Sequence, residues 1–183
     1  MPHQADCKTP LDPNFAETIR LLNAHDVPYW VCHGTLLGLV RDGELIPWDH
    51  DIDIAIWAGA FSKESLIDLM TASSYALKSD GADYDFVSFV KPGGREVDFN
   101  YYRTSGGAET AYSEWFISRS RVSNFLEILS SKAQYDGRWS WLVRRLRFLS
   151  PLASFLVRSL KRRGIFYKSA GYTTPAHMLR EFE

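Results

Sequence analysis

The sequence predicts a fold of the α+β or α/β class, in which helices cover the faces of a β-sheet. Apolar residues make up 45% of its 183 residues and aromatic residues 14%, enough to fill a sizeable core. Segments with the helical spacing of apolar residues alternate with short β-branched and aromatic runs. Since no internal repeat or low-complexity tract interrupts this order, we expect one compact layered domain.

The first third of the chain is predicted to hold two helices with a strand between them. Asp12 and Pro13 suit the N-cap and the first position of a helix over residues 13–24. The aromatic and β-branched run at 29–32 indicates a strand. A Gly-Thr pair follows, and residues 36–41 indicate a short helix that ends at Asp-Gly.

The middle third is predicted to be mostly β-strand. Residues 46–48 are expected to be extended, because proline disfavours helix at the residue before it. Residues 51–57 alternate between polar and apolar, which indicates a strand, and Ser62 is placed to cap the following helix. Residues 84–90 and 95–102 indicate the two strands of a hairpin around Lys-Pro-Gly-Gly.

The last third is predicted to be helical over residues 121–133 and 139–163, with a break or kink at Pro151. The chain is thereby divided into an N-terminal tail (1–12), a core (13–136) and a basic helical C-terminal segment that packs on the core (137–183).

The net charge of −1 conceals a strong asymmetry. Residues 1–136 hold 20 Asp and Glu against 11 Lys and Arg, whereas residues 137–180 hold ten basic residues and no acidic one. Such a segment indicates an anionic partner, namely nucleotide phosphate, a polyanionic acceptor or a membrane surface, or else it packs on the acidic core. For residues 139–163, a helical cap on the sheet is favoured over an amphipathic segment in peripheral contact with a membrane.

A cytoplasmic location is expected, with peripheral membrane contact as the alternative. Residues 1–12 are polar and contain proline, unlike a signal peptide. No uncharged apolar run approaches the roughly 20 residues of a membrane-spanning helix. Cys7 and Cys32 are too few for a disulfide framework or a cysteine-rich zinc site.

Three carboxylates are predicted to converge on one face of the sheet. Asp51 and Asp53 are two residues apart on a strand, so their side chains share a face, and Asp98 lies in a second alternating strand. Such a cluster is costly without a cation. Because all of these ligands are oxygen atoms, the sequence predicts Mg²⁺ or Mn²⁺ rather than zinc.

Gly34 and Thr35 follow a strand and open a helix, a position where backbone N–H groups bind anions. A phosphate cradle beside a metal cluster fits metal-assisted phosphoryl or nucleotidyl transfer. Either motif alone is usually structural, so the prediction rests on the Gly-Thr pair together with Asp-x-Asp and a later strand aspartate.

These residues resemble those of a known family. Residues 34–38 (GTLLG), Arg41 and residues 46–53 (IPWDHDID) closely resemble the LicD family, which includes fukutin and fukutin-related protein. Residues 97–99 (VDF) and, more weakly, 175–179 (PAHML) extend the resemblance. It implies a nucleotidyltransferase-like mixed sheet flanked by helices, with its catalytic core in the 13–136 segment.

The resemblance implies a transferase that moves a phospho-alcohol, such as phosphocholine or ribitol phosphate, from a CDP-activated donor to a glycan or glycolipid hydroxyl and releases CMP. It implies Asp51, Asp53 and Asp98 as metal ligands and Asp49 as a further acid. Either Asp98 or Asp49 is expected to accept the proton of the acceptor hydroxyl.

Five neighbouring residues are assigned to binding the substrate and its phosphates: Gly34, Thr35, Arg41, His33 and Trp48. Three of them have a structural alternative. Arg41 could pair with Asp42 or Asp49, Trp48 could belong to the core, and His33 could be a hydrogen-bonded turn residue.

Two other function classes stay open. An NTP-dependent nucleotidyltransferase that modifies a small molecule or protein would share the acid cluster and release pyrophosphate. A non-catalytic module that binds a polyanion or a membrane would need only the basic segment. Nucleic acid is not an expected partner, because the core is acidic and carries no nucleic-acid-reading motif.

Overall fold

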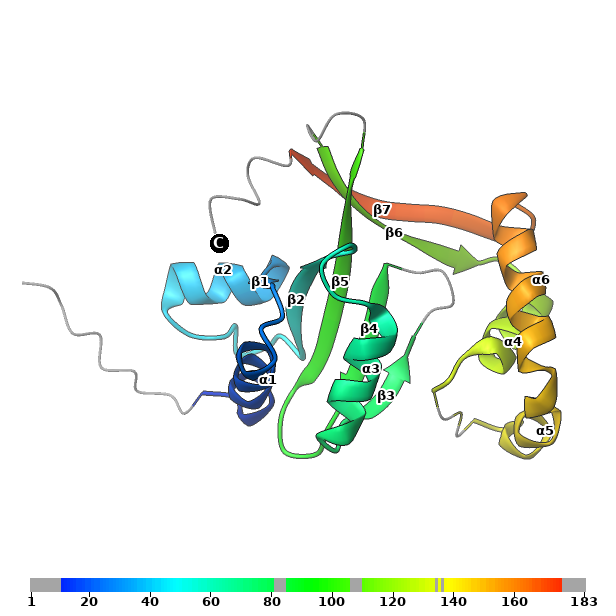
Figure 1. Ribbon diagram of the computed structural model, residues 1–183, viewed down its shortest axis with the longest axis horizontal. Helices are drawn as coiled ribbons and strands as arrows, with labels where there is room; N and C mark the ends of the chain where they lie inside the picture. The colour runs from blue at the N-terminus through cyan, green and yellow to red at the C-terminus, as the bar shows by residue number, and fades with distance from the viewer. Residues whose placement is uncertain (1–10, 81–84, 106–109, 134, 136, 176–183) are drawn as a thin grey trace, which may run out of the picture.

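The computed structural model describes residues 11–80, 85–105, 110–133, 135 and 137–175, which form a seven-stranded mixed sheet flanked by helices (Figure 1). The predicted α+β class is confirmed. The helices are α1 (Pro13–Ala24), α2 (His33–Asp42), α3 (Lys63–Ala72), α4 (Arg121–Ser130), α5 (Ser140–Leu146), the 3-10 helix η1 (Arg147–Leu149) and α6 (Ser150–Arg162). The strands are β1 (Trp30–Val31), β2 (Asp51–Trp57), β3 (Ala76–Ser79), β4 (Phe86–Val90), β5 (Glu96–Ser105), β6 (Thr110–Ser118) and β7 (Tyr167–Pro175).

The long strand β5 organises the sheet. Its first half lies between β2, which runs parallel to it, and β4, which runs antiparallel, in the order β1-β2-β5-β4-β3. Its last residues pair with β6, and β6 pairs with β7 over nine residues. Figure 1 shows β6 and β7 crossing from the tip of β5 toward α6.

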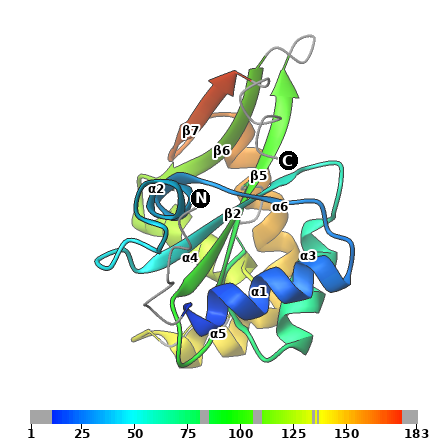
Figure 2. The ribbon, with the colours of Figure 1, turned by 90° about the vertical axis from the view of Figure 1, so that its left-hand side faces the viewer.

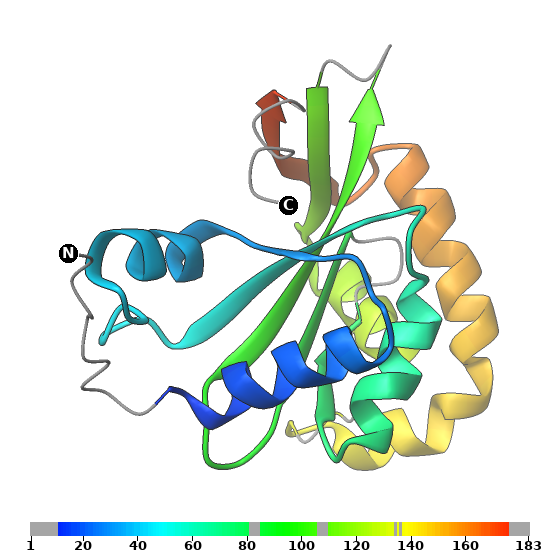
Figure 3. The same ribbon diagram turned by 60° about the vertical axis from the view of Figure 1, so that its left-hand side comes forward.

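The apolar face of the central strands is the core of the molecule. Ile52, Ile54 and Ile56 of β2 and Val97 and Phe99 of β5 are fully buried. They share one cluster with apolar residues of α1 and α3, and Figure 2 and Figure 3 show both helices against this face. Period-2 alternation therefore leaves the aspartates of both strands on the opposite face.

Local capping explains why α1 begins as the sequence predicts. The Asp12 carboxylate accepts hydrogen bonds from the backbone N–H groups of Asn14 and Phe15. It also accepts one from the backbone of Arg95, at 3.1 Å, in the β4–β5 turn. The helix start is thus tied to the sheet. The Ser62 cap of α3 is confirmed as well, since its hydroxyl accepts from Ser65 N–H.

Two predicted segments differ from the structure. Residues 46–48 are not simply extended, because Pro47 and Trp48 form a turn closed by a hydrogen bond from Asp49 N–H to the Ile46 carbonyl. Residues 167–175 form strand β7, so the C-terminal segment is not helical throughout. Pairing with β6 decides this, a long-range interaction that local spacing does not reveal. The weak resemblance at 176–179 lies outside the described residues.

The C-terminal helices pack on one another and on β6 at one end of the molecule, while α2 lies at the other end (Figure 1). The predicted break near Pro151 is confirmed, since α5 and α6 are separate helices joined by η1. Ala153, Val157 and Lys161 of α6 are buried. Lys161 pairs with Glu127 of α4 at 3.3 Å.

Candidate active site

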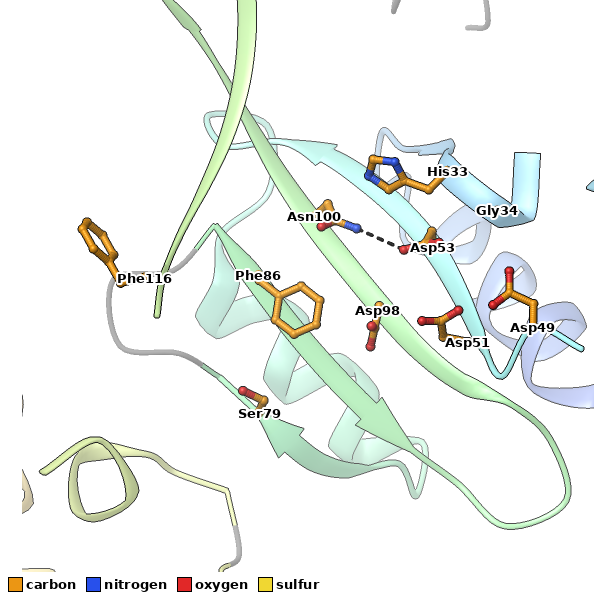
Figure 4. Close-up of a pocket in the computed structure, with 10 residues that line it drawn as sticks. All are labelled: His33, Gly34, Asp49, Asp51, Asp53, Ser79, Phe86, Asp98, Asn100 and Phe116. Atoms are coloured by element: carbon orange, nitrogen blue, oxygen red, sulfur yellow. Dashed lines mark hydrogen bonds between the residues drawn. The ribbon is translucent and has the colours of Figure 1, made fainter. Parts of the chain in front are cut away.

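Parallel pairing of β2 and β5 brings the predicted acid cluster together. In this register Asp53 lies directly opposite Asp98, and Asp51 lies opposite Glu96. Because residues paired in register point to the same face, Asp51, Asp53 and Asp98 all extend from the face that the core does not occupy (Figure 4). The geometry on which the predicted cluster depends is therefore present.

The cluster lines a pocket of about 620 Å³, a volume typical of small-molecule sites. The lining residues are His33, Gly34, Asp49, Asp51, Asp53, Ser79, Phe86, Asp98, Asn100 and Phe116. Figure 4 shows the four aspartates at one end, beside the start of α2, and Phe116 at the other, with Phe86 between them. The pocket thus has an acidic end and an aromatic end.

Burial and mutual repulsion raise the pKa values of these carboxyl groups. Burial, followed by the charges of Asp51, Asp98 and Asp49, raises the pKa of Asp53 to about 7. Burial, followed by the charges of Glu96 and Asp51, raises the pKa of Asp98 to about 6. The pKa of Asp51 is also raised, first by burial and then by its contact with Asp49. The protein alone therefore disfavours full ionisation of the cluster.

The donor chemistry of the acidic end fits a divalent cation. Oδ1 of Asp98 is buried without a hydrogen-bond partner, and an unpartnered carboxylate oxygen is costly in that position. Oδ1 of Asp53 meets the Nδ2 donor of Asn100 only at 3.5 Å. As their side chains stand, no three His, Cys, Asp or Glu residues of the described chain form a closed ligand set. The acidic end suits a divalent cation because its ligands are oxygen atoms and because a cation would neutralise its buried charge.

The start of α2 faces the acidic end of this pocket. The N-cap of the helix is Cys32, and no side chain caps it, so the start of the helix has the character of an anion site. A Cβ at Gly34 would collide with the Asp49 carboxylate. Glycine is therefore what lets this carboxylate lie against the helix start.

Thr35 has a different place from the one predicted. Its side chain is only 2% exposed, and its hydroxyl accepts a hydrogen bond of 2.8 Å from the backbone N–H of Asp53. It does not line the pocket. Its hydroxyl fixes the position of β2 relative to α2 and so positions Asp53, instead of facing a phosphate.

Arg41 and Trp48 are not brought to the pocket. Arg41 is exposed and pairs with Asp42 at 2.6 Å, which is one of the structural alternatives that the sequence left open. Trp48 is 73% exposed in the turn before β2, so the core position that the sequence left open is wrong for it.

His33 does line the pocket, and burial lowers the pKa of its imidazole. Its Nε2 lies 3.4 Å from the hydroxyl of Tyr102. The residue adopts a left-handed backbone with φ of 50°, a conformation that costs free energy outside glycine and is commonest at functional sites.

Sequence reasoning missed four lining residues. Asn100 follows Asp98 on the same face of β5, and alternation alone could have identified it. Phe86 lies opposite Asn100 in the β4–β5 register, which only the hairpin reveals. Ser79 and Phe116 come from strands that the sequence did not predict, so no local signal was available.

Comparison with known proteins relates this site to a sequence family. Residues 26–127 match the profile of the LicD/FKTN/FKRP nucleotidyltransferase domain. Ribitol 5-phosphate transferase FKRP of human and of mouse are each 46% identical to the chain over 39 residues, which is 21% of this chain and 8% of theirs. Uncharacterized protein RP689 of Rickettsia prowazekii is 48% identical over 40 residues, 22% of this chain and 15% of its own length. The match thus spans only a small part of these relatives.

Proposed function

Because the chain belongs to the LicD/FKTN/FKRP family of nucleotidyltransferase domains, we propose that it is a transferase of phosphorus-containing groups. Its substrate would be a CDP-activated phospho-alcohol of the phosphocholine or ribitol phosphate type, its acceptor a glycan or glycolipid hydroxyl, and its leaving group CMP. The observation that carries this proposal is the pocket in which the acid cluster of β2 and β5 adjoins the uncapped start of α2.

Asp51, Asp53 and Asp98 are the residues that would hold Mg²⁺ or Mn²⁺. The ion would supply positive charge for the donor diphosphate and for the leaving CMP. This assignment is supported by the unpartnered oxygen of Asp98 and by the raised pKa values of Asp53 and Asp98.

The remaining groups of the pocket would bind and orient the substrates. N–H groups at the start of α2, which no side chain caps, would hold a phosphate oxygen. The aromatic end with Phe86 and Phe116 offers stacking faces for a nucleobase. Asp49 or Asp98 would accept the proton as the acceptor oxygen bonds to phosphorus and the bond to CMP breaks.

The proposal is tested by incubating the protein with Mg²⁺ and CDP-choline, CDP-ribitol or the nucleoside triphosphates, with glycan acceptors present. CMP release that depends on acceptor and on Mg²⁺ is expected, and Asp53→Asn should abolish it. Asp68→Asn, on the exposed surface of α3, is the matched control and should retain full activity. Pyrophosphate release from a triphosphate, with no CMP from either CDP donor, would contradict the proposal.

That contrary outcome defines the second candidate, an NTP-dependent nucleotidyltransferase, which the matched domain type and the shared acid cluster also favour. A non-catalytic role is separated from both by cellular complementation. It would leave the function of Asp51→Asn and Asp53→Asn variants intact.

A further inference from the structure

We propose that the outer face of α6 and the preceding η1 is a docking surface for an anionic lipid bilayer. The surface is defined by three apolar residues, Phe148, Leu152 and Phe155, and three arginines, Arg158, Arg162 and Arg163. This inference does not depend on the proposed chemistry, because it arises from a different part of the molecule.

The apolar residues of this surface form one exposed stripe. Phe148, Leu152 and Phe155 are 75%, 55% and 62% exposed, and they recur at spacings of four and three along the chain. Leu152 and Phe155, three residues apart in α6, lie on one side of that helix, and Phe148 precedes them in η1. The opposite side of α6 carries the buried Ala153 and Val157, so the exposed stripe points away from the protein.

The charge of the segment matches an anionic surface. Arg158, Arg162 and Arg163 are exposed, and none of them pairs with a carboxylate within the described part of the chain. No acidic residue occurs between positions 137 and 180. An amphipathic helix with aromatic residues on one side and arginines nearby is the pattern of segments that lie in the lipid headgroup region.

The one lysine of α6 is buried and neutralised by the fold, in contrast to the three arginines of the surface. Lys161 points inward, where it pairs with Glu127 and lies over the rings of Phe116 and Tyr167. The acidic core therefore takes up one basic residue of α6 and leaves the outer three to solvent.

A bilayer explains this surface better than a second copy of the chain does. A symmetric dimer through this face would gather six arginines in one interface with no acidic residue of the surface to pair them, and like charges there repel. Three large apolar side chains also contribute little to binding a phosphodiester backbone. Among the described residues no helix is long and apolar enough to cross a bilayer.

The surface lies close to the pocket. Lys161 on the inner side of α6 lies 5.4 Å from the ring centroid of Phe116, which lines the aromatic end of the pocket. A helix with its side chains is about 10 Å across. A bilayer against the outer side would thus hold the pocket near the membrane surface.

Co-sedimentation of the full chain with vesicles tests the proposal. Vesicles of phosphatidylcholine alone are compared with vesicles that also contain phosphatidylserine, at low and at physiological ionic strength. Binding to the anionic vesicles that weakens with salt is expected. Arg158→Gln, Arg162→Gln and Arg163→Gln should each reduce the partition coefficient by about fivefold, and the pair Phe148→Ser and Phe155→Ser should abolish salt-resistant binding.

Val40→Ser and Arg20→Gln are the matched controls, since they change an exposed apolar and an exposed basic residue on α2 and α1. Both should bind vesicles like the parent protein. Equal pelleting with neutral vesicles, or loss of binding in the controls, would overturn the proposal. So would a dimer in sedimentation velocity that Phe155→Ser dissociates, or binding to single-stranded RNA without binding to vesicles.

Discussion

Single side chains decide how the acid cluster is held, and Thr35 is the clearest case. Its hydroxyl accepts a hydrogen bond from the backbone N–H of Asp53, and the residue is buried from water. Thr35→Val keeps the shape of the side chain but leaves that N–H without an acceptor, so we expect a loss of about 1–3 kcal/mol in the free energy of unfolding. Urea denaturation measures it.

Thr35 is a positioning residue, so the same variant should also weaken Mg²⁺ binding in calorimetry, because Asp53 moves with its backbone. Thr35→Ser keeps the acceptor and should restore most of the Mg²⁺ affinity. If Thr35→Val lowers stability but binds Mg²⁺ like the parent protein, Thr35 supports only the fold.

Gly34 controls the site through the space that it leaves. Gly34→Ala places a Cβ where the Asp49 carboxylate now lies. Because Asp49 is only half-buried and can rotate away, we expect the unfolding midpoint to change little while CMP release falls by about tenfold or more, from a misplaced acid and phosphate site. Gly59→Ala is the matched control. Gly59 has open space around it, so this change should leave both the unfolding midpoint and CMP release unaltered.

At the scale of elements, one carboxylate both caps helix α1 and joins its start to the sheet. Asp12 accepts N–H groups from the first turn of α1 and from Arg95 in the β4–β5 turn. Asp12→Ala should therefore lower the free energy of unfolding by about 1–2 kcal/mol, as loss of a helix cap does. Asp12→Asn keeps one acceptor oxygen and should lose less of this free energy. Thermal unfolding of the parent protein and both variants measures the difference.

The elements that the sequence predicted correctly are those with local signals. Asp12 before Pro13 and Ser62 before Lys63 mark helix starts by their own side chains, and the alternation of residues 51–57 marks β2. Strands β6 and β7 have no such signal, because polar residues, a glycine and aromatic residues are mixed along them. Their nine-residue pairing with each other stabilises them, and it brings together segments about 60 residues apart.

Local signals also decided which of the site residues could be predicted from the sequence. Asp51 and Asp53 share a face by local alternation, and the parallel register then places Asp98 beside them, as the sequence suggested. Arg41 and Trp48 lie close to the cluster in sequence, yet neither lines the pocket. Proximity along the chain predicted the acids of β2, and it failed for Arg41 in α2 and for Trp48 in the turn before β2.

At the scale of the whole molecule, the chain concentrates negative charge in one pocket at its centre, and this should make its stability depend on pH. The folded-state pKa values of about 7 for Asp53 and about 6 for Asp98 lie above the ordinary value of 3.8. At pH values between 3.8 and these folded-state pKa values, the folded protein therefore binds more protons than the unfolded chain. The stability contributed by these two protonated groups is present at low pH and is lost as the pH rises through about 6 to 7.

In EDTA, we accordingly expect the free energy of unfolding to fall by on the order of 4 kcal/mol between pH 5 and pH 8, with the larger share from Asp53. Asp53→Asn removes the group with the largest shift, so its profile should be flatter and its stability at pH 8 higher than that of the parent protein. Mg²⁺ should stabilise the parent protein at pH 8, where the carboxylates are ionised, far more than at pH 5, and it should have little effect on Asp53→Asn. Urea denaturation of the parent protein and of Asp53→Asn, at both pH values and with and without Mg²⁺, measures these free energies of unfolding. Equal stabilisation by Mg²⁺ of parent and variant would mean that the ion binds elsewhere, and the acid cluster would then have to be explained without it.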